Sequence, residues 1–167
     1  KVDRESEEYK SFFGDSDQVQ MLLNFYLNNH LFLALARKDA EPIIQALKDL
    51  PQTTIKEQMG VFIRNHDELD LERLTDKQRQ EVYEAFAPDE SMRIYGRGIR
   101  RRLAPMLGND RRWMELVYSL MFTLPGTPVL RYGDEIGMGE DLSLPERNSV
   151  RTAMQWSGER HGGFSAS

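Results

Sequence analysis

The chain has 167 residues, of which 40% are hydrophobic and 29% are charged, a composition typical of a globular domain rather than a disordered chain. Its formal net charge of −5 at pH 7 argues against a nucleic-acid partner, which would require a basic excess on one face. The sequence has no cysteine, which excludes disulfides and thiolate metal sites and favours a cytoplasmic location. No stretch reaches the roughly 20 apolar residues of a membrane span, so we expect no membrane partner.

The start of the chain, Lys-Val-Asp-Arg-Glu at residues 1–5, has neither an initiator Met nor the pattern of a signal peptide. We therefore expect the chain to begin inside a longer protein. Its first few residues are polar, and we expect them to be frayed or to belong to an incoming linker.

A nearly continuous apolar run occupies residues 21–35. Its front predicts a strand that is buried on both faces, because the apolar residues are too continuous to alternate. Asn28 and Asn29 are interpreted as the turn from this strand into a helix. A second series has helical spacing and predicts a helix between Pro42 and Pro51, with apolar residues at Ile43, Ile44, Leu47 and Leu50.

The second half of the chain begins with another short buried strand, predicted over residues 59–63. Residues 75–78, Thr-Asp-Lys-Gln, form a capping box that opens a helix to about Phe86. Apolar residues recur at three- and four-residue intervals over residues 110–124, which predicts a third helix. Residues 129–132 then predict a third strand.

The order strand, helix, strand, helix, helix, strand predicts an α/β fold with parallel strands joined by helical crossovers. Only three strands are predicted, whereas a closed eight-stranded barrel typically needs about 250 residues. The chain therefore cannot build such a barrel unaided.

A polar cluster, Asn-His-Asp-Glu at residues 65–68, lies just beyond the strand at 59–63. Catalytic groups of parallel α/β folds lie where strands end, because the strand fixes the backbone while the side chains face an open edge. An imidazole beside a carboxylate could bind sugar hydroxyls, orient a nucleophile or hold a metal, although no cysteine or second nearby histidine supports a metal. The alternative is that Asn65 and Asp67 are turn and cap residues and that His66 is satisfied by backbone.

Two further clusters are open to a simpler interpretation. The run Arg100-Arg101-Arg102 could bind phosphate, but we favour a solvated helix face whose arginines form ion pairs with acidic residues. Gly133-Asp134-Glu135 places carboxylates after a strand, but tight turns favour Gly and Asp for conformational reasons of their own.

Several segments, in the right order and covering nearly the whole chain, resemble the α-amylase superfamily. Residues 61–69, Val-Phe-Ile-Arg-Asn-His-Asp-Glu-Leu, are similar to its fourth signature, a hydrophobic strand that ends in Asn-His-Asp. Residues 125–138 resemble its eighth barrel strand with the following turn, and residues 150–156 resemble the Met-Gln-Trp element of members that act on maltose and α-glucosides. Residues 99–105 and 109–112 narrow the resemblance towards trehalose synthases.

This resemblance implies a fold: a partial (β/α)8 barrel in which the chain carries strands six to eight with their helices. Residues 1–140 would form the C-terminal part of the catalytic barrel. Residues 141–167 would form the loop region after strand eight, with the Met-Gln-Trp element and a flexible tail.

The same resemblance implies roles for five residues. Asp67 matches the third catalytic carboxylate, which stabilises the transition state and contacts the sugar ring. His66 matches the residue that hydrogen-bonds sugar hydroxyls in the −1 subsite, and Asn65 belongs to the same substrate-binding signature. Arg151 and Glu72, on loops expected to face the same side, are further candidates for substrate contact or pocket gating.

The implied activity is that of a parent enzyme that interconverts maltose and trehalose by retaining intramolecular glucosyl transfer, with hydrolysis of maltose or related α-glucosides as the alternative. The nucleophilic Asp, the acid/base Glu and a B domain with a calcium site would lie upstream of residue 1. We therefore expect no cofactor in this chain, no activity of the chain alone, and self-association or complementation by the missing barrel half through open strand edges. A non-catalytic carbohydrate-binding or structural role is the alternative of a different class.

Overall fold

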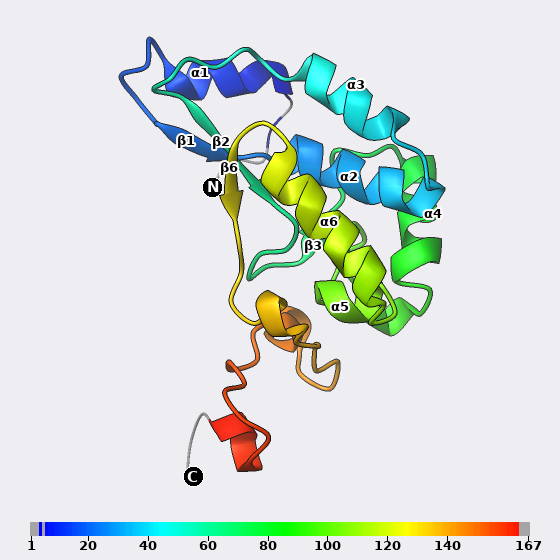
Figure 1. Ribbon diagram of the computed structural model, residues 1–167. Helices are drawn as coiled ribbons and strands as arrows, with labels where there is room; N and C mark the ends of the chain where they lie inside the picture. Colours follow the sequence, from blue (N-terminus) through cyan, green and yellow to red (C-terminus); the bar gives the residue numbers. More distant parts are fainter. Residues whose placement is uncertain (1–3, 5, 164–167) are drawn as a thin grey trace.

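A parallel three-stranded sheet forms the centre of the fold (Figure 1), in a computed structural model that describes residue 4 and residues 6–163. Its strands are β1 (Met21–Leu23), β2 (Gln58–Phe62) and β6 (Thr127–Val129), in the order β1-β2-β6. Leu23 lies opposite Gly60, and Phe62 lies opposite Val129. Helices connect these parallel strands, which confirms the predicted α/β class.

Helical crossovers separate the three strands in sequence. Helices α2 (Phe25–Arg37) and α3 (Glu41–Asp49) connect β1 to β2. The segment between β2 and β6 holds α4 (Asp76–Phe86), α5 (Leu103–Met106) and α6 (Arg111–Thr123). In Figure 1, α2 and α6 lie on the same side of the sheet, so one face of the sheet is covered by helices.

Shorter elements complete the described part of the chain. Helix α1 (Tyr9–Phe13) precedes β1, and a small antiparallel sheet is formed by β3 (Leu69–Asp70), β5 (Gly98–Ile99) and β4 (Arg93–Ile94). Single turns of 3₁₀ helix occur at Ser6–Glu8, Glu90–Met92, Asp134–Ile136, Glu146–Val150 and Arg160–Gly163.

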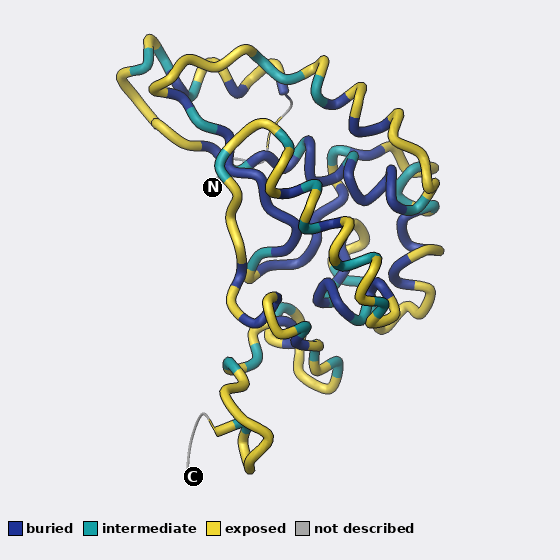
Figure 2. The backbone as a smooth tube through the Cα atoms, viewed as in Figure 1, coloured by how far each residue is buried: buried dark blue, intermediate teal, exposed yellow. Residues whose placement is uncertain are grey.

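The main hydrophobic core lies between the helices and the central strand. Figure 2 shows β2 and α2 largely buried, whereas β6 is largely exposed. The core joins residues from all of the larger helices with the strand end of β2, among them Phe32, Ile63, Leu71, Val82, Ile99 and Val117. The fold therefore buries the strand whose end carries the predicted site.

The interpretation of Asn28 and Asn29 as a strand-to-helix turn is wrong. The strand ends at Leu23 and the helix begins at Phe25, with the Asn24 side chain accepting a hydrogen bond from the Leu27 amide at 3.0 Å. Asn28 and Asn29 are buried inside this helix. A continuous apolar run fits a buried strand and a buried helix equally well, so the hydrophobic pattern could not locate this boundary.

A helix near the start of the chain was not predicted, and the third strand ends earlier than predicted. Residues 9–13 form a helix whose Tyr9 and Phe13 are fully buried, so the segment directly after the first few polar residues is packed against the fold. The third strand ends at Val129 rather than at Tyr132. Residues 1–3 and 5, where we expect fraying or a linker, lie outside the described residues.

The predictions for the three helices after α2 are confirmed. Thr75 and Gln78 form both hydrogen bonds of the capping box, and α4 ends at Phe86. Helix α3 has Pro42 in its first turn, and the helix predicted over residues 110–124 is α6, with Asp110 as its N-cap. No helix within residues 6–163 is long and apolar enough to cross a membrane.

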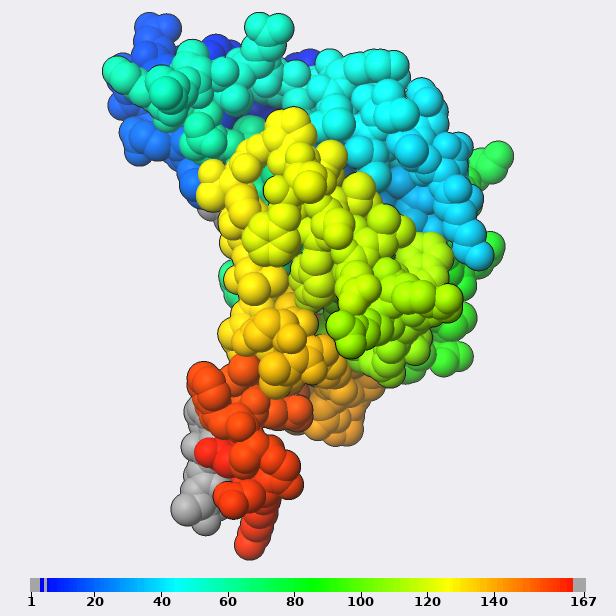
Figure 3. All heavy atoms as spheres, viewed as in Figure 1, coloured from blue at the N-terminus to red at the C-terminus, as the bar shows by residue number. Residues whose placement is uncertain are grey.

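The segment after residue 150 extends away from the main body at the foot of Figure 3. Its residues 151–156 have no regular secondary structure, and most of them are exposed. Residues 164–167 of the expected flexible tail lie outside the described residues, and the division of the chain at residue 140 stays a prediction.

Candidate active site at the end of strand β2

The polar cluster at 65–68 lies at the carboxyl end of β2, between β2 and β3, as predicted. The Asn28 side chain donates hydrogen bonds to the Phe62 and Ile63 carbonyl oxygens at 2.8 and 2.9 Å, which anchors the end of the strand to α2. The Asn65 side chain then accepts a hydrogen bond from the Asp67 amide at 2.8 Å, closing a turn. The backbone that presents Asp67 is therefore fixed from both sides.

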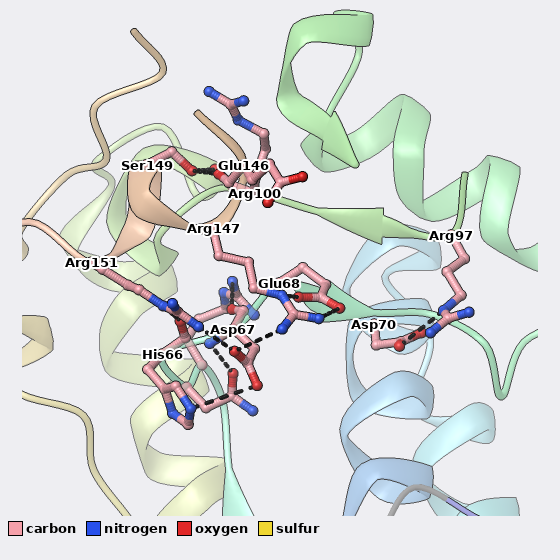
Figure 4. A network of polar contacts seen from close by, with 12 residues as sticks. His66, Asp67, Glu68, Asp70, Arg97, Arg100, Glu146, Arg147, Ser149 and Arg151 are labelled. Carbon is pink, nitrogen blue, oxygen red and sulfur yellow. Dashed lines mark hydrogen bonds and ion pairs between the residues drawn. The ribbon is translucent and has the colours of Figure 1, made fainter. Parts of the chain in front are cut away.

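The Asp67 carboxylate is the centre of the site (Figure 4), with only 7% of its side chain exposed. Arg151 donates from Nη2 to Asp67 Oδ1 at 2.8 Å, and Arg147 Nη1 lies 3.6 Å from the same oxygen. His66 Nε2 lies 3.6 Å from the other oxygen, Oδ2, while 70% of the His66 side chain is exposed. A shielded carboxylate thus lies beside an accessible imidazole.

A second ion pair lies directly beside Asp67. Arg147 donates from Nε and Nη2 to the two carboxylate oxygens of Glu68 at 2.5 and 3.0 Å, and these hydrogen bonds raise the pKa of Arg147. The Arg147 guanidinium also lies 5.3 Å from the centre of the Tyr95 ring. The pair connects the loop after β2 with the 3₁₀ helix at Glu146–Val150, so it holds that helix beside Asp67.

Three buried arginines, Arg64, Arg102 and Arg131, lie beneath this site. Arg64 donates to the Asp67 and Arg101 carbonyl oxygens at 3.0 and 2.9 Å. Arg102 donates to Asp134 Oδ1 at 2.9 Å in an ion pair whose two side chains are 0% and 3% exposed. The three guanidiniums outnumber the one carboxylate buried among them, that of Asp134. Backbone carbonyl oxygens therefore accept several of their hydrogen bonds.

Burial controls the ionisation of this arginine cluster. Burial, with the nearby charge of Arg131, lowers the pKa of Arg64 to about 9. Burial and the charge of Arg102 lower the pKa of Arg131. Burial raises the pKa of Asp134, against the opposite effect of its hydrogen bond from Arg102. Removing the negative charge of Asp134 from this cluster would leave the buried guanidiniums uncompensated.

The solvated helix face predicted for Arg100-Arg101-Arg102 is wrong. The three residues precede α5 in an extended segment, and Arg102 is fully buried. Arg101 does pair with an acidic residue, as predicted, since its Nε lies 2.8 Å from the Glu140 carboxylate. Only 13% of its side chain is exposed, however, so it does not lie on a solvated face. An arginine run gives no signal of burial in the sequence, because its partners are carbonyl oxygens and acidic residues 15 to 38 positions away.

The structure brings four of the five predicted site residues together: Asn65, His66, Asp67 and Arg151. Arg151 also donates from Nε to the His66 carbonyl oxygen at 2.8 Å. Glu72 belongs to a different group, since it forms ion pairs with Arg73 at 3.2 Å and with Arg97 at 4.0 Å. In Figure 4, Arg97 lies on the far side of Glu68 from Asp67.

Arg147 was missed by the sequence reasoning, and Glu68 was recognised only as part of a polar cluster. Their contact joins positions 79 residues apart, and no local pattern signals such a pairing. Within the described ranges no group of three or more His, Asp or Glu side chains could hold a metal ion. The arrangement instead offers a carboxylate, an imidazole and guanidiniums, which can form hydrogen bonds with the hydroxyl groups of a polar ligand.

Known proteins resemble this chain along almost its whole length. The family model described as "Alpha amylase, catalytic domain" matches residues 3–167. A "Trehalose synthase" of Thermus thermophilus is 51% identical over 162 residues, which cover 95% of this chain and 16% of that protein. A "Trehalose synthase/amylase TreS" of Mycolicibacterium smegmatis is 46% identical over 159 residues, covering 93% of this chain and 27% of that protein.

A third relative, "Trehalose synthase/amylase TreS" of Mycobacterium tuberculosis, is 45% identical over 158 residues, covering 92% of this chain and 26% of that protein. The chain thus spans only 16% to 27% of the length of these relatives. The similarity to trehalose synthases that residues 99–105 and 109–112 suggested is confirmed. With a catalytic-domain match from residue 3 to residue 167, the chain belongs to the α-amylase catalytic-domain family.

Proposed function

We propose that this chain forms strands six to eight of the (β/α)8 barrel of a trehalose synthase-like enzyme. The order β1-β2-β6 supports this assignment, because three parallel strands that are neighbours in space follow one another along the chain with helical crossovers between them. The (β/α)8 barrel repeats this unit. Asp67 follows the middle strand, at the end where barrel enzymes carry their active sites.

The observation that carries the functional proposal is the shielded Asp67 carboxylate, held by Arg151 beside the exposed imidazole of His66. In retaining glucosyl transfer the sugar passes through an oxocarbenium-like transition state, in which hydrogen bonds to its hydroxyl groups strengthen. We assign Asp67 to stabilising that state and His66 to binding sugar hydroxyls. Asn65 shapes the turn that presents Asp67, and Arg151 contacts substrate or closes the pocket.

Glu72 lies apart from the other four site residues, and we propose a different role for it. Its ion pairs with Arg73 and Arg97 place it at the small antiparallel sheet, so we assign it to the pocket's outer rim. The nucleophilic Asp and the acid/base Glu would come from a preceding part of a longer protein. On this account the isolated chain is inactive, and the longer protein interconverts maltose and trehalose.

Hydrolysis is the second candidate activity. Two of the three similar proteins described above carry the name "Trehalose synthase/amylase", which joins a synthase with a hydrolase. Transfer and hydrolysis differ in the acceptor, which is a sugar hydroxyl in one case and water in the other. The exclusion of water from the closed site therefore decides between them.

A proton NMR time course of maltose with the longer protein that contains this chain tests the proposal. Trehalose as the main product supports the synthase assignment. Glucose as the only product would move the assignment to an α-glucosidase. A folded protein that does not convert maltose would contradict the proposed activity.

A further inference from the structure

Two consecutive residues after β6, Arg131 and Tyr132, hold the backbone on both sides of Arg151. Arg131 donates from Nη2 to the carbonyl oxygen of Val150. Tyr132 donates from its hydroxyl group to the carbonyl oxygen of Thr152 at 2.7 Å. The two carbonyls flank Arg151, which otherwise lies in a segment without regular secondary structure.

Arg131 also reaches the loop that carries Asp67. Its Nη1 donates to the Asn65 carbonyl oxygen at 2.6 Å, two residues before Asp67. A single guanidinium therefore bridges the two loops whose side chains meet in the Arg151–Asp67 contact of 2.8 Å. Arg131 is only 7% exposed, so water competes little for these hydrogen bonds.

We propose that Arg131 and Tyr132 are positioning residues, which set the Arg151 guanidinium against the Asp67 carboxylate by fixing the backbone around both. This inference rests on the proposed function of Asp67. The planar fork of arginine directs two nitrogens at two separate carbonyls, whereas a lysine carries a single ammonium group on a flexible stem. The Tyr132 hydroxyl adds the second anchor, without which residue 151 is held on one side only.

The test measures kcat and KM for maltose in the longer protein carrying Arg131→Lys or Tyr132→Phe. We expect kcat/KM to fall about 100-fold in the first variant and about tenfold in the second, because a displacement of about 1 Å near the reacting atoms has effects of this size. Tyr132 is 45% exposed, so Tyr132→Phe should fold even if Arg131→Lys does not.

Matched controls remove the same kinds of hydrogen bond elsewhere. Arg93 donates to the Ala87 and Pro88 carbonyls, and Tyr26 donates from its hydroxyl group to Asp49 Oδ2 at 2.8 Å. Arg93→Lys and Tyr26→Phe should lower thermal stability as much as the test variants, yet leave KM within about twofold of the wild-type value. KM does not depend on the folded fraction, so a rise in KM in the test variants but not in the controls separates positioning from a general loss of stability.

Hydrogen–deuterium exchange over residues 146–156 gives a readout that needs no turnover. Tyr132→Phe should accelerate exchange there, whereas Tyr26→Phe should not. Unchanged exchange in Tyr132→Phe, or kcat/KM within about twofold of wild type in both test variants, would overturn the inference. If Asp67→Asn retains full activity, the proposed function fails instead; if Asp67→Asn is inactive and both test variants are normal, only this inference fails.

Discussion

The carboxylate of Glu68 is held by both Nε and Nη2 of Arg147, at 2.5 and 3.0 Å, across 79 residues of sequence. Only 2% of the Glu68 side chain is exposed, compared with 37% of the Arg147 side chain. Because Glu68 follows Asp67 directly, this pair fixes the orientation of the loop that presents the central carboxylate of the site.

We expect Arg147→Met to lower the free energy of unfolding by about 1–2 kcal/mol, less than for a fully buried pair because Arg147 is partly solvated. The loss arises because Glu68 stays buried without its guanidinium partner. Urea unfolding followed by circular dichroism measures the change. Arg111→Met is the control, since the Arg111–Glu115 pair is exposed on both sides and should contribute little. Equal effects of the two substitutions would contradict the structural importance of the Glu68 pair.

The ion pair between Arg102 and Asp134 should contribute more to stability than the pair between Glu68 and Arg147. Both side chains are buried, and Asp134 is hydrogen-bonded to Arg102 among three guanidiniums. We predict that Asp134→Asn lowers the free energy of unfolding by about 3–5 kcal/mol, because it leaves buried cations uncompensated. Asp76→Asn, at a side chain that is 98% exposed, serves as the comparison in the same unfolding experiment. A loss below about 1 kcal/mol for Asp134→Asn would show that the cluster tolerates its excess charge.

Acid should weaken the corner formed by α1 and the segment before β2. Hydrogen bonds from the Thr54 amide and the Ser16 hydroxyl, together with Lys10, lower the pKa of Glu57 below 4.5, although its burial acts in the opposite direction. A lowered carboxyl pKa stabilises the fold above the unfolded-state value, and this contribution disappears as the pH falls through the folded-state value. Glu57→Gln should therefore reduce the melting temperature at neutral pH, but much less in acid once the pH is below the lowered folded-state pKa of Glu57. A difference from wild type that stays constant with pH would contradict this assignment.

The isolated chain should associate with itself. Within residues 6–163, β1 and β6 each pair only with β2, and exposed apolar side chains lie along these edges, including Met21, Val129 and Leu130. Unpaired strand edges and exposed apolar surface favour association. Size-exclusion chromatography should show oligomers that Val129→Lys reduces, whereas Ile55→Lys, at an exposed loop residue, should not. A monomeric chain at all concentrations would contradict the expectation.

Local sequence signals predicted the fold well wherever one short segment contains the information. The capping box at Thr75 and Gln78 and the spacing of apolar residues in α6 depend on neighbours within a few positions. The boundary between β1 and α2 was not predicted, because the apolar residues from Phe25 to Leu27 fit a buried strand and a buried helix equally well. The burial of Arg102 was not predicted, because its partners Tyr132 and Asp134 are about 30 residues away in sequence.

The candidate site was predicted in part by position and in part by resemblance. The end of a buried strand identified residues 65–68 as a place where chemistry could occur, but it gave no role to Asp67. The resemblance supplied that role and pointed to Arg151, whose contact with Asp67 spans 84 residues. Neither source predicted Arg147, Arg131 or Tyr132, because their partners are distant in sequence and, for Arg131 and Tyr132, are backbone carbonyls.

The most direct test of the account is the rate at which the longer protein carrying Asp67→Asn converts maltose. Asparagine keeps the size of the side chain but removes its negative charge, so stabilisation of the oxocarbenium-like transition state is lost. We predict that formation of trehalose and of glucose both fall by about 1,000-fold, since both products arise through the same transition state. Asp76→Asn should retain the wild-type rate. An Asp67→Asn protein that stays within about tenfold of that rate would contradict the assignment of Asp67 to the active site.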